Sequence, residues 1–169
     1  MNLAERTKPI RILLVEDSAS VRELLIYVLS SDPLLQVVAA AVNGEQAVDM
    51  AQGLKPDVIL MDIHLPKMDG FAATRKIMET CPTRIVMVTA NLVPGDIAAT
   101  FQALESGALT VLAKPPGTGH PEYRRSVEEL LQTVKLMSEV QVVKRWSRAS
   151  GVPIDAARQP PVVDDHNNG

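Results

Sequence analysis

The sequence alternates short apolar runs with amphipathic stretches five times, and this alternation restricts the possible folds more than any other feature. The apolar runs predict strands at residues 10–15, 36–42, 58–61, 84–88 and 109–112. Helical spacing of apolar residues predicts helices after Ser18, before Gly53, at 71–79, at 96–106 and from Glu122 onwards. Strict alternation of strand and helix predicts an α/β fold, a doubly wound five-stranded parallel sheet with helices on both faces.

Length and composition fit one domain followed by a tail. The chain has 169 residues, of which 46% are hydrophobic, and a formal net charge of −3. This charge argues against a broad basic face for nucleic acid. No apolar run reaches the roughly 18–20 residues of a membrane span, and residues 1–8 do not resemble a signal peptide. A single cysteine, Cys81, excludes an internal disulfide, and we expect a reducing, cytoplasmic setting.

Three segments are expected: an N-terminal extension at 1–8, the domain itself at 9–140, and a helix extension with a flexible tail or linker at 141–169. The last helix leaves two alternatives open. If it continues from Glu122 to Trp146, it is about 37 Å long and overshoots a sheet of about 17–20 Å, which would suit a coupling or dimer contact. Otherwise it ends or bends near Val140, and the remainder is linker.

Side chains capable of chemistry follow four of the predicted strands. Glu16 and Asp17 follow the first strand, Asp62 the third, Thr89 the fourth and Lys114 the fifth. Because ligand sites in open parallel sheets lie at the carboxyl ends of the strands, these side chains are expected at one edge. Three carboxylates there suit Mg²⁺, which prefers oxygen ligands, and a hydroxyl and an ammonium could hold phosphoryl oxygens. Each residue alone also fits an ordinary turn, cap or surface charge, so the hypothesis rests on their conjunction.

The same residues lie in motifs that resemble the receiver domain of response regulators in two-component signalling. The motifs are at residues 12–18, 61–70, 88–90, 107–108 and 114–115, and the resemblance extends over about 9–140. It implies a flavodoxin-like fold with strand order 2-1-3-4-5. It also implies a function, in which Asp62 accepts a phosphoryl group from a sensor histidine kinase in a Mg²⁺-dependent reaction and the domain then changes conformation.

The resemblance further implies which groups would bind the metal. Asp17 and Asp62 would bind Mg²⁺ directly, and Glu16 would bind it through water. The backbone carbonyl of His64 would be another ligand, whereas the imidazole ring of His64 is not expected to bind the metal.

Three further residues would hold the phosphoryl group itself. Lys114 would pair with Asp62 at rest and with a phosphoryl oxygen after transfer, while Thr89 and the Ala90 backbone N–H would bond to the phosphoryl group. The resemblance also implies a cis peptide bond between Lys114 and the proline that follows it. One departure is Val111, which stands where family members often place an aromatic residue that moves with the threonine, so the route of the signal to the output surface is open.

Residues 61–70, 106–121 and 135–146 resemble the N-terminal receiver of chemotaxis protein-glutamate methylesterases. This resemblance implies a chemotaxis-type kinase as one partner, and a downstream output protein or a covalently linked methylesterase domain as the other. The esterase nucleophile turn, of Gly-Ala-Ser-Thr-Gly-Gly type, does not occur in the sequence, so the chain is not expected to be a conventional enzyme. It is either the regulatory part of a methylesterase or a stand-alone receiver.

Rival functions come from other classes of protein. A haloacid-dehalogenase-type phosphatase also uses a strand-end aspartate, Mg²⁺, a threonine and a lysine, but it needs a second aspartate two residues after the first, where this chain has His64. A degenerate receiver would serve only as a binding scaffold; the complete site argues against it, whereas Val111 favours it. A DNA-binding regulator would need an output domain, and nothing after Trp146 is expected to fold into one.

Overall fold

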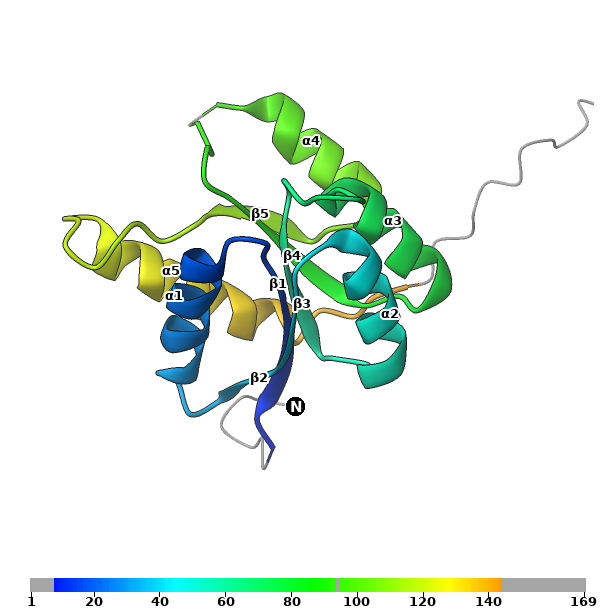
Figure 1. Cartoon of the computed structure of the whole chain (residues 1–169), viewed down its shortest axis with the longest axis horizontal. Helices are drawn as coiled ribbons and strands as arrows, with labels where there is room; N and C mark the ends of the chain where they lie inside the picture. The colour runs from blue at the N-terminus through cyan, green and yellow to red at the C-terminus, as the bar shows by residue number, and fades with distance from the viewer. Residues whose placement is uncertain (1–7, 94, 144–169) are drawn as a thin grey trace, which may run out of the picture.

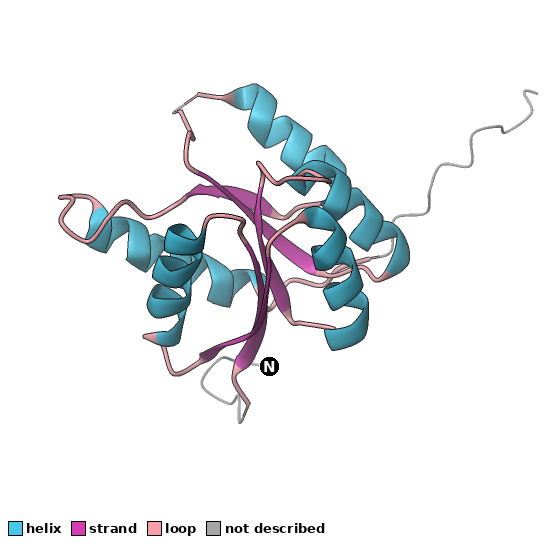
Figure 2. Ribbon diagram, viewed as in Figure 1, coloured by secondary structure: helices cyan, strands magenta, loops and turns pink. Residues whose placement is uncertain are grey.

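The computed structural model describes residues 8–93 and 95–143, in which strands and helices alternate along the chain (Figures 1 and 2). The strands are β1 (Ile10–Val15), β2 (Leu35–Ala41), β3 (Val58–Asp62), β4 (Arg84–Thr89) and β5 (Thr110–Ala113). The helices are α1 (Ala19–Ser30), α2 (Gly44–Leu54), α3 (Gly70–Thr80), α4 (Ile97–Ser106) and α5 (Tyr123–Met137). The predicted elements are all present. Most of their ends are shifted, by one or two residues, from the predicted positions.

The strands form one five-stranded parallel sheet in the order β2-β1-β3-β4-β5, which confirms the predicted fold. The register places Asp62 beside Val88 and Thr89 beside Ala113, so the last residues of β3, β4 and β5 meet at one edge. The strand order reverses at β1, which lies between β2 and β3. Open α/β sheets bind ligands at the carboxyl ends of strands beside such a reversal.

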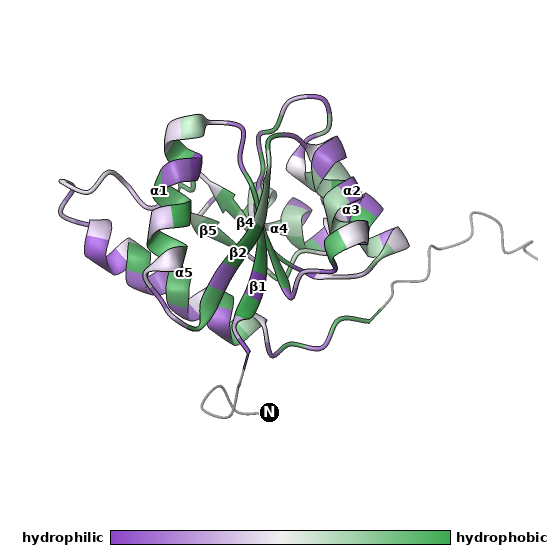
Figure 3. Cartoon of the chain, turned by 60° about the horizontal axis from the view of Figure 1, so that its bottom comes forward, coloured by the Kyte–Doolittle hydropathy of each residue, from purple (hydrophilic) through white to green (hydrophobic). Residues whose placement is uncertain are grey.

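Two apolar layers hold the helices to the sheet. Residues of α1 and α5 form one layer, and residues of α2, α3 and α4 form the other, on the opposite face (Figure 1). All of β3 is buried between the layers, which explains its unbroken apolar sequence. Apolar residues concentrate on the strands and on the helix faces turned toward them (Figure 3). In the ranges that the structure describes, no helix has both the length and the apolar character that a membrane crossing requires.

Short polar side chains cap three of the helices. Asn43, Asp69 and Asp96 each accept a hydrogen bond from the backbone N–H three residues later, which satisfies a donor that the first helical turn leaves free. Ser18, the predicted cap of α1, occupies the N-cap position, but its side chain makes no capping hydrogen bond. Its hydroxyl lies 3.3 Å from the hydroxyl of Ser20 instead.

The predicted end of α2 at Gly53 is wrong. The helix continues to Leu54, and Lys55 is the C-cap, with a left-handed φ of 47°. Arg11 supplies the physical reason, because its Nη1 donates to the carbonyl oxygens of Leu54 at 2.8 Å and of Lys55 at 3.1 Å. These carbonyls have no partner within the helix, so a contact from β1 sets the helix end in place of the local glycine signal.

The last helix, α5, ends at Met137. Over the described residues, the alternative of a continuous helix to Trp146 is therefore wrong. The alternative of an end near Val140 is confirmed. Its 15 residues span about 22 Å, close to the length of the sheet. Ser138 is buried, and its hydroxyl donates to the carbonyl of Lys135 at 2.6 Å where the chain leaves the helix. Residues 1–7 and 144–169, which include most of the two predicted extensions, lie outside the described residues, and the dimer contact stays a prediction.

Replacing Gly70 by alanine is expected to destabilise the protein, because a Cβ there would lie 2.2 Å from the Asp62 carbonyl oxygen and 2.9 Å from Cα of Ile63. The backbone around Asp62 would have to move, at a cost of about 1–3 kcal/mol. Gly53→Ala is the matched control: no atom lies within 4 Å of its Cβ, so it is expected to stabilise the helix by about 0.4–1 kcal/mol. Urea unfolding measures both values, and equal stabilities for the two variants would contradict this packing.

Candidate functional site

Three carboxylates meet at the carboxyl edge of the sheet. Oxygen atoms of Glu16, Asp17 and Asp62 lie within 4.8 Å of one another. Glu16 and Asp62 are 1% and 2% exposed, whereas Asp17 is open to solvent. The sequence separates Asp62 from the other two by a complete helix–strand–helix passage, and β1–β3 pairing brings them together. The structure therefore assembles the acidic group that the strand ends predicted.

Lys114 lies between the two buried carboxylates. Its Nζ donates to Oδ2 of Asp62 at 2.9 Å and is 2.7 Å from Oε2 of Glu16. The backbone N–H of His64 donates to the other oxygen of Asp62 at 3.2 Å, and that of Ser18 donates to Oε1 of Glu16 at 3.2 Å. One ammonium thus offsets much of the repulsion between two carboxylates that have almost no contact with water.

The proton affinities of these groups reflect this crowding. Burial raises the pKa of Glu16 above its usual value, the Asp62 charge adds to the rise, and Lys114 opposes it. Burial alone would lower the pKa of Lys114, but its contacts with Glu16 and Asp62 raise it above the ordinary lysine value. Lys114 is therefore fully charged near neutral pH, and the site retains a net negative charge.

The chemistry of this cluster fits a divalent cation. The Oε2 atom of Glu16 is buried and, although it is close to Lys114, no donor reaches it with hydrogen-bond geometry. It therefore has a lone pair available for a metal-bound water. Asp17 and Asp62 add carboxylate oxygens, and Mg²⁺ keeps several of its waters while binding one or two carboxylates. Among the described residues, this is the group of carboxylates arranged for a metal.

Thr89 and Ala90 lie next to the cluster along the sheet. Thr89 is buried at the end of β4, its carbonyl accepts the Lys114 N–H at 2.9 Å, and its hydroxyl accepts the Asn91 N–H at 3.4 Å. Ala90 follows in an exposed turn. His64 is exposed, so its side chain is at the surface while its N–H contacts Asp62. The structure thus places each predicted site residue at or beside the same edge.

Arg22 also belongs to the site, although the sequence analysis did not select it. Its Nη1 donates to the carbonyl oxygen of Glu16 at 3.0 Å and to that of Asp17 at 3.4 Å. The guanidinium thereby links the first turns of α1 to the two residues that carry the carboxylates. The available signal was weak: an arginine on a helical stretch a few residues after an acidic pair is usually a solvated surface charge.

The Lys114–Pro115 peptide bond and the position of Val111 are two further features of this edge. No peptide bond in the described residues is cis, so the Lys114–Pro115 bond is trans and the predicted cis bond is wrong here. Trans is the lower-energy state of X–Pro bonds by about 0.5–1 kcal/mol. Val111 is 9% exposed and belongs to the apolar layer that α4 covers, so a small buried side chain stands at this position.

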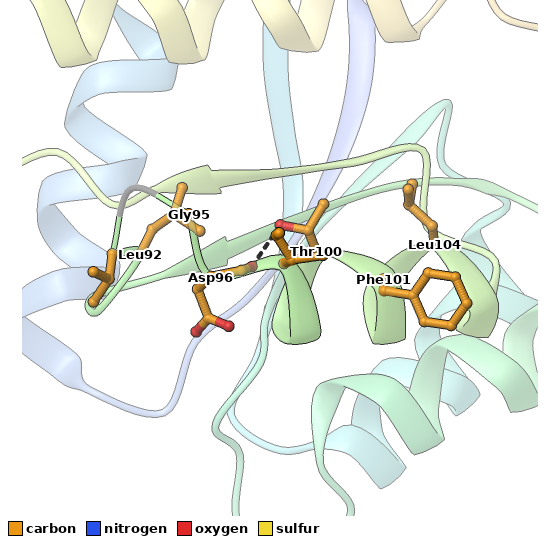
Figure 4. A pocket seen from close by; sticks show the side chains of 8 residues that line it. Leu92, Gly95, Asp96, Thr100, Phe101 and Leu104 are labelled. Atoms are coloured by element: carbon orange, nitrogen blue, oxygen red, sulfur yellow. Dashed lines mark hydrogen bonds between the residues drawn. The ribbon is translucent and has the colours of Figure 1, made fainter.

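An apolar cavity of about 400 Å³ lies beside α4 and the loop that precedes this helix (Figure 4). Ile97, Phe101 and Leu104, which are 78%, 61% and 43% exposed, form an apolar strip along the helix. The one charged side chain in its wall, Asp96, uses its carboxylate to cap α4. Because the carboxylate of Asp96 is engaged as a helix cap, the carboxylate cluster is the better candidate for a reactive site than this cavity. Helical spacing at positions 97, 101 and 104 could have revealed the strip from the sequence.

Replacing Lys114 by methionine is expected to lower the free energy of unfolding at pH 7 by about 3 kcal/mol, because two buried carboxylates lose their counter-charge. In the native protein the pKa of Lys114 is raised above the ordinary lysine value. The stabilisation that its charge gives to the folded state is therefore complete below the ordinary lysine pKa and is lost only as the pH rises through the pKa of Lys114 in the folded protein. In the variant, acidification should recover stability as Glu16, whose pKa is raised, takes up a proton. Urea unfolding between pH 4 and 8 measures this pH dependence.

Lys76→Met, on the exposed face of α3, is the control, and its free energy of unfolding should stay within about 0.5 kcal/mol of the wild-type value. A loss equal to that of Lys114→Met would contradict the role given to Lys114.

Proteins of known type are similar to this chain in sequence. The sequence model of the response regulator receiver domain matches residues 12–120. A protein-glutamate methylesterase/protein-glutamine glutaminase of Nitrosospira multiformis is 51% identical over 142 residues, which are 84% of this chain and 40% of that protein. The chain thus spans about two fifths of the length of the curated relatives that it matches.

Solved structures agree with the family match. The response regulator domain of Thermotoga maritima CheB has a TM-score of 0.71 and 39% identity, over 79% of this chain and 99% of that domain. A chain in the complex of the P1 domain of CheA3 with CheY6 from R. sphaeroides has a TM-score of 0.66 and 31% identity, over 79% of this chain and 99% of that one. With the sheet order, the acidic edge and the family match in agreement, the chain belongs to the response regulator receiver family, in the form found in CheB-type methylesterases of chemotaxis.

Proposed function

We propose that residues 9–140 are a phosphoryl-accepting switch in which Asp62 is the acceptor. The observation that carries this proposal is the environment of its carboxylate, which contacts the Lys114 ammonium at 2.9 Å and lies within 4.8 Å of the oxygens of Glu16 and Asp17. An acceptor for a highly charged group needs compensating positive charge and fixed donors around it more than it needs covalent chemistry. Both are built into this edge of the sheet.

The transfer step would form one bond and break another. An oxygen of Asp62 attacks phosphorus of a phosphohistidine, the O–P bond forms, the N–P bond breaks, and the departing imidazole takes up a proton. Lys114 would then pair with one phosphoryl oxygen, and the Thr89 hydroxyl and the Ala90 N–H would bond to the others. Water later attacks the phosphorus, which releases inorganic phosphate and restores the carboxylate.

Glu16, Asp17, Asp62 and the His64 carbonyl would hold Mg²⁺, which when bound would neutralise charge on the transferring group. Support for this set comes from the geometry of the three carboxylates, whose oxygens lie within 4.8 Å of one another. Arg22 keeps the carbonyls of Glu16 and Asp17 engaged, so their side chains project from an ordered loop. Arg22 would therefore position two of the metal ligands without binding the metal itself.

We further propose that this switch regulates a methylesterase domain, in chemotaxis-type signalling and in a reducing, cytoplasmic compartment. Its relatives include proteins named as methylesterases, of which this chain spans 40%, and one structural neighbour is in a complex with the P1 domain of CheA3. A kinase of that type is the proposed donor, and residues 141–169 are the proposed connection to a following domain. The chain of 169 residues is proposed to act by itself as a switch without esterase activity. The alternative is that it is a stand-alone receiver.

Incubation with Mg²⁺ and acetyl phosphate tests the acceptor by intact mass. The wild-type chain should gain one phosphoryl group, and Asp62→Asn should gain none. Asp49→Asn is the matched control, because Asp49 is an exposed carboxylate on α2, and it should gain a phosphoryl group as the wild type does. If the wild type gains none and also fails to bind beryllofluoride, a degenerate scaffold is the correct description; a gain in Asp62→Asn would move the acceptor elsewhere.

Mg²⁺ alone is expected to raise the thermal midpoint of the unphosphorylated chain, because a ligand of the folded state stabilises it by about 1.4 kcal/mol at ten times its dissociation constant. Asp17→Asn should abolish most of this shift, since Asp17 is the exposed carboxylate of the cluster, and Asp49→Asn should keep it. Differential scanning calorimetry with and without Mg²⁺ gives the comparison. A full shift in Asp17→Asn would remove that residue from the metal site.

A further inference from the structure

The segment that follows α5 passes around the sheet. α5 packs on the face that it shares with α1, through Leu130 and Val134. Val142, only five residues after the helix ends at Met137, packs against the apolar layer on the opposite face. Figure 1 shows this segment, in orange, crossing from the side of α1 and α5 to the side of α2. We call residues 138–143 the strap.

A polar anchor holds the middle of the strap. The Nε of Arg84, the first residue of β4, donates to the carbonyl oxygen of Val140 at 2.5 Å. The same guanidinium lies 3.5 Å from the carbonyl oxygen of Asp57, just before β3. The half-buried arginine thus joins the strap to the amino-terminal ends of two central strands, and a hydrogen bond from a charged donor is among the stronger ones in proteins.

An apolar anchor holds its far end. Val142 is half-buried and lines a cavity of about 470 Å³ together with Cys81, Pro82 and residues at the end of α2. Val143, the next residue, is 78% exposed. Neighbouring valines therefore have opposite environments, which is what an extended segment lying on a surface produces.

We propose that the strap is docked on the amino-terminal edge of the sheet by Arg84 and Val142, and that this docking sets the point at which the chain leaves the domain. Asp62 is the last residue of β3 and Asp57 precedes its first, so the exit and the acidic cluster lie at opposite ends of a strand about 17 Å long. Any segment attached after the strap would therefore begin at the edge of the sheet remote from Asp62.

Cys81 reports on the strap, because it is the single cysteine of the chain and shares the cavity with Val142. Alkylation by iodoacetamide, followed by intact mass, measures how accessible the half-buried thiol of Cys81 is beside Val142. Arg84→Met keeps the apolar stem but removes the donors, and Val142→Ser removes the apolar anchor. Each variant is expected to raise the alkylation rate about tenfold, which corresponds to about 1.4 kcal/mol of lost docking.

Val143→Ser is the matched control, because it makes the same change one residue further along at an exposed position, and its rate should equal that of the wild type. Hydrogen exchange distinguishes strap release from general loosening. The hydrogen-bonded N–H groups of residues 138–140 should lose protection in the two anchor variants, while β3 should keep it. Unchanged alkylation in Arg84→Met and Val142→Ser, an equal rise in Val143→Ser, or loss of protection in β3 would each overturn the proposal. None of these readouts depends on phosphorylation.

Discussion

The balance of charge around Lys114 is the interaction on which the rest of the site depends. Two carboxylates with 1% and 2% exposure would repel each other strongly in a medium of low polarity. The ammonium at 2.7 and 2.9 Å offsets much of that repulsion. Because one cation faces three carboxylates, the cluster remains short of positive charge. The contacts with Lys114 therefore stabilise the buried carboxylates, while the excess of carboxylates over ammonium groups at this edge favours binding of a cation.

Arginines tie the loops of this sheet to its strands by one recurring device. Arg22 binds the carbonyls of Glu16 and Asp17 at the carboxyl edge. At the amino-terminal edge, Arg11 binds two carbonyls at the end of α2, and Arg84 binds one carbonyl after α5. Each guanidinium satisfies main-chain acceptors that no helix or strand supplies with a donor. Loop geometry at both edges thus depends on long side chains from other elements.

The sheet and the acidic cluster were predictable because both follow from periodicity and from the order of strand ends. The apolar run of β3 indicated a central strand, and Asp62 at its end could meet only residues at other strand ends. Features set by distant contacts escaped the same reasoning. The end of α2 depends on Arg11, which is 43 residues from Leu54 in sequence, and the turn after α5 depends on Arg84, 56 residues from Val140. Local propensity at Gly53 carries no information about either arginine.

The position of the strap has a practical consequence for sensors built on this domain. A fluorescent protein fused after Val143 would be attached at the amino-terminal edge of the sheet. The length of β3 would separate this point from the carboxylates. Energy transfer between that fusion and a dye near the acidic edge would then report the fixed dimension of the domain and respond little to its chemical state. A reporter pair that spans α4 and the fusion point would instead sample the side of the domain, where the exposed apolar strip lies.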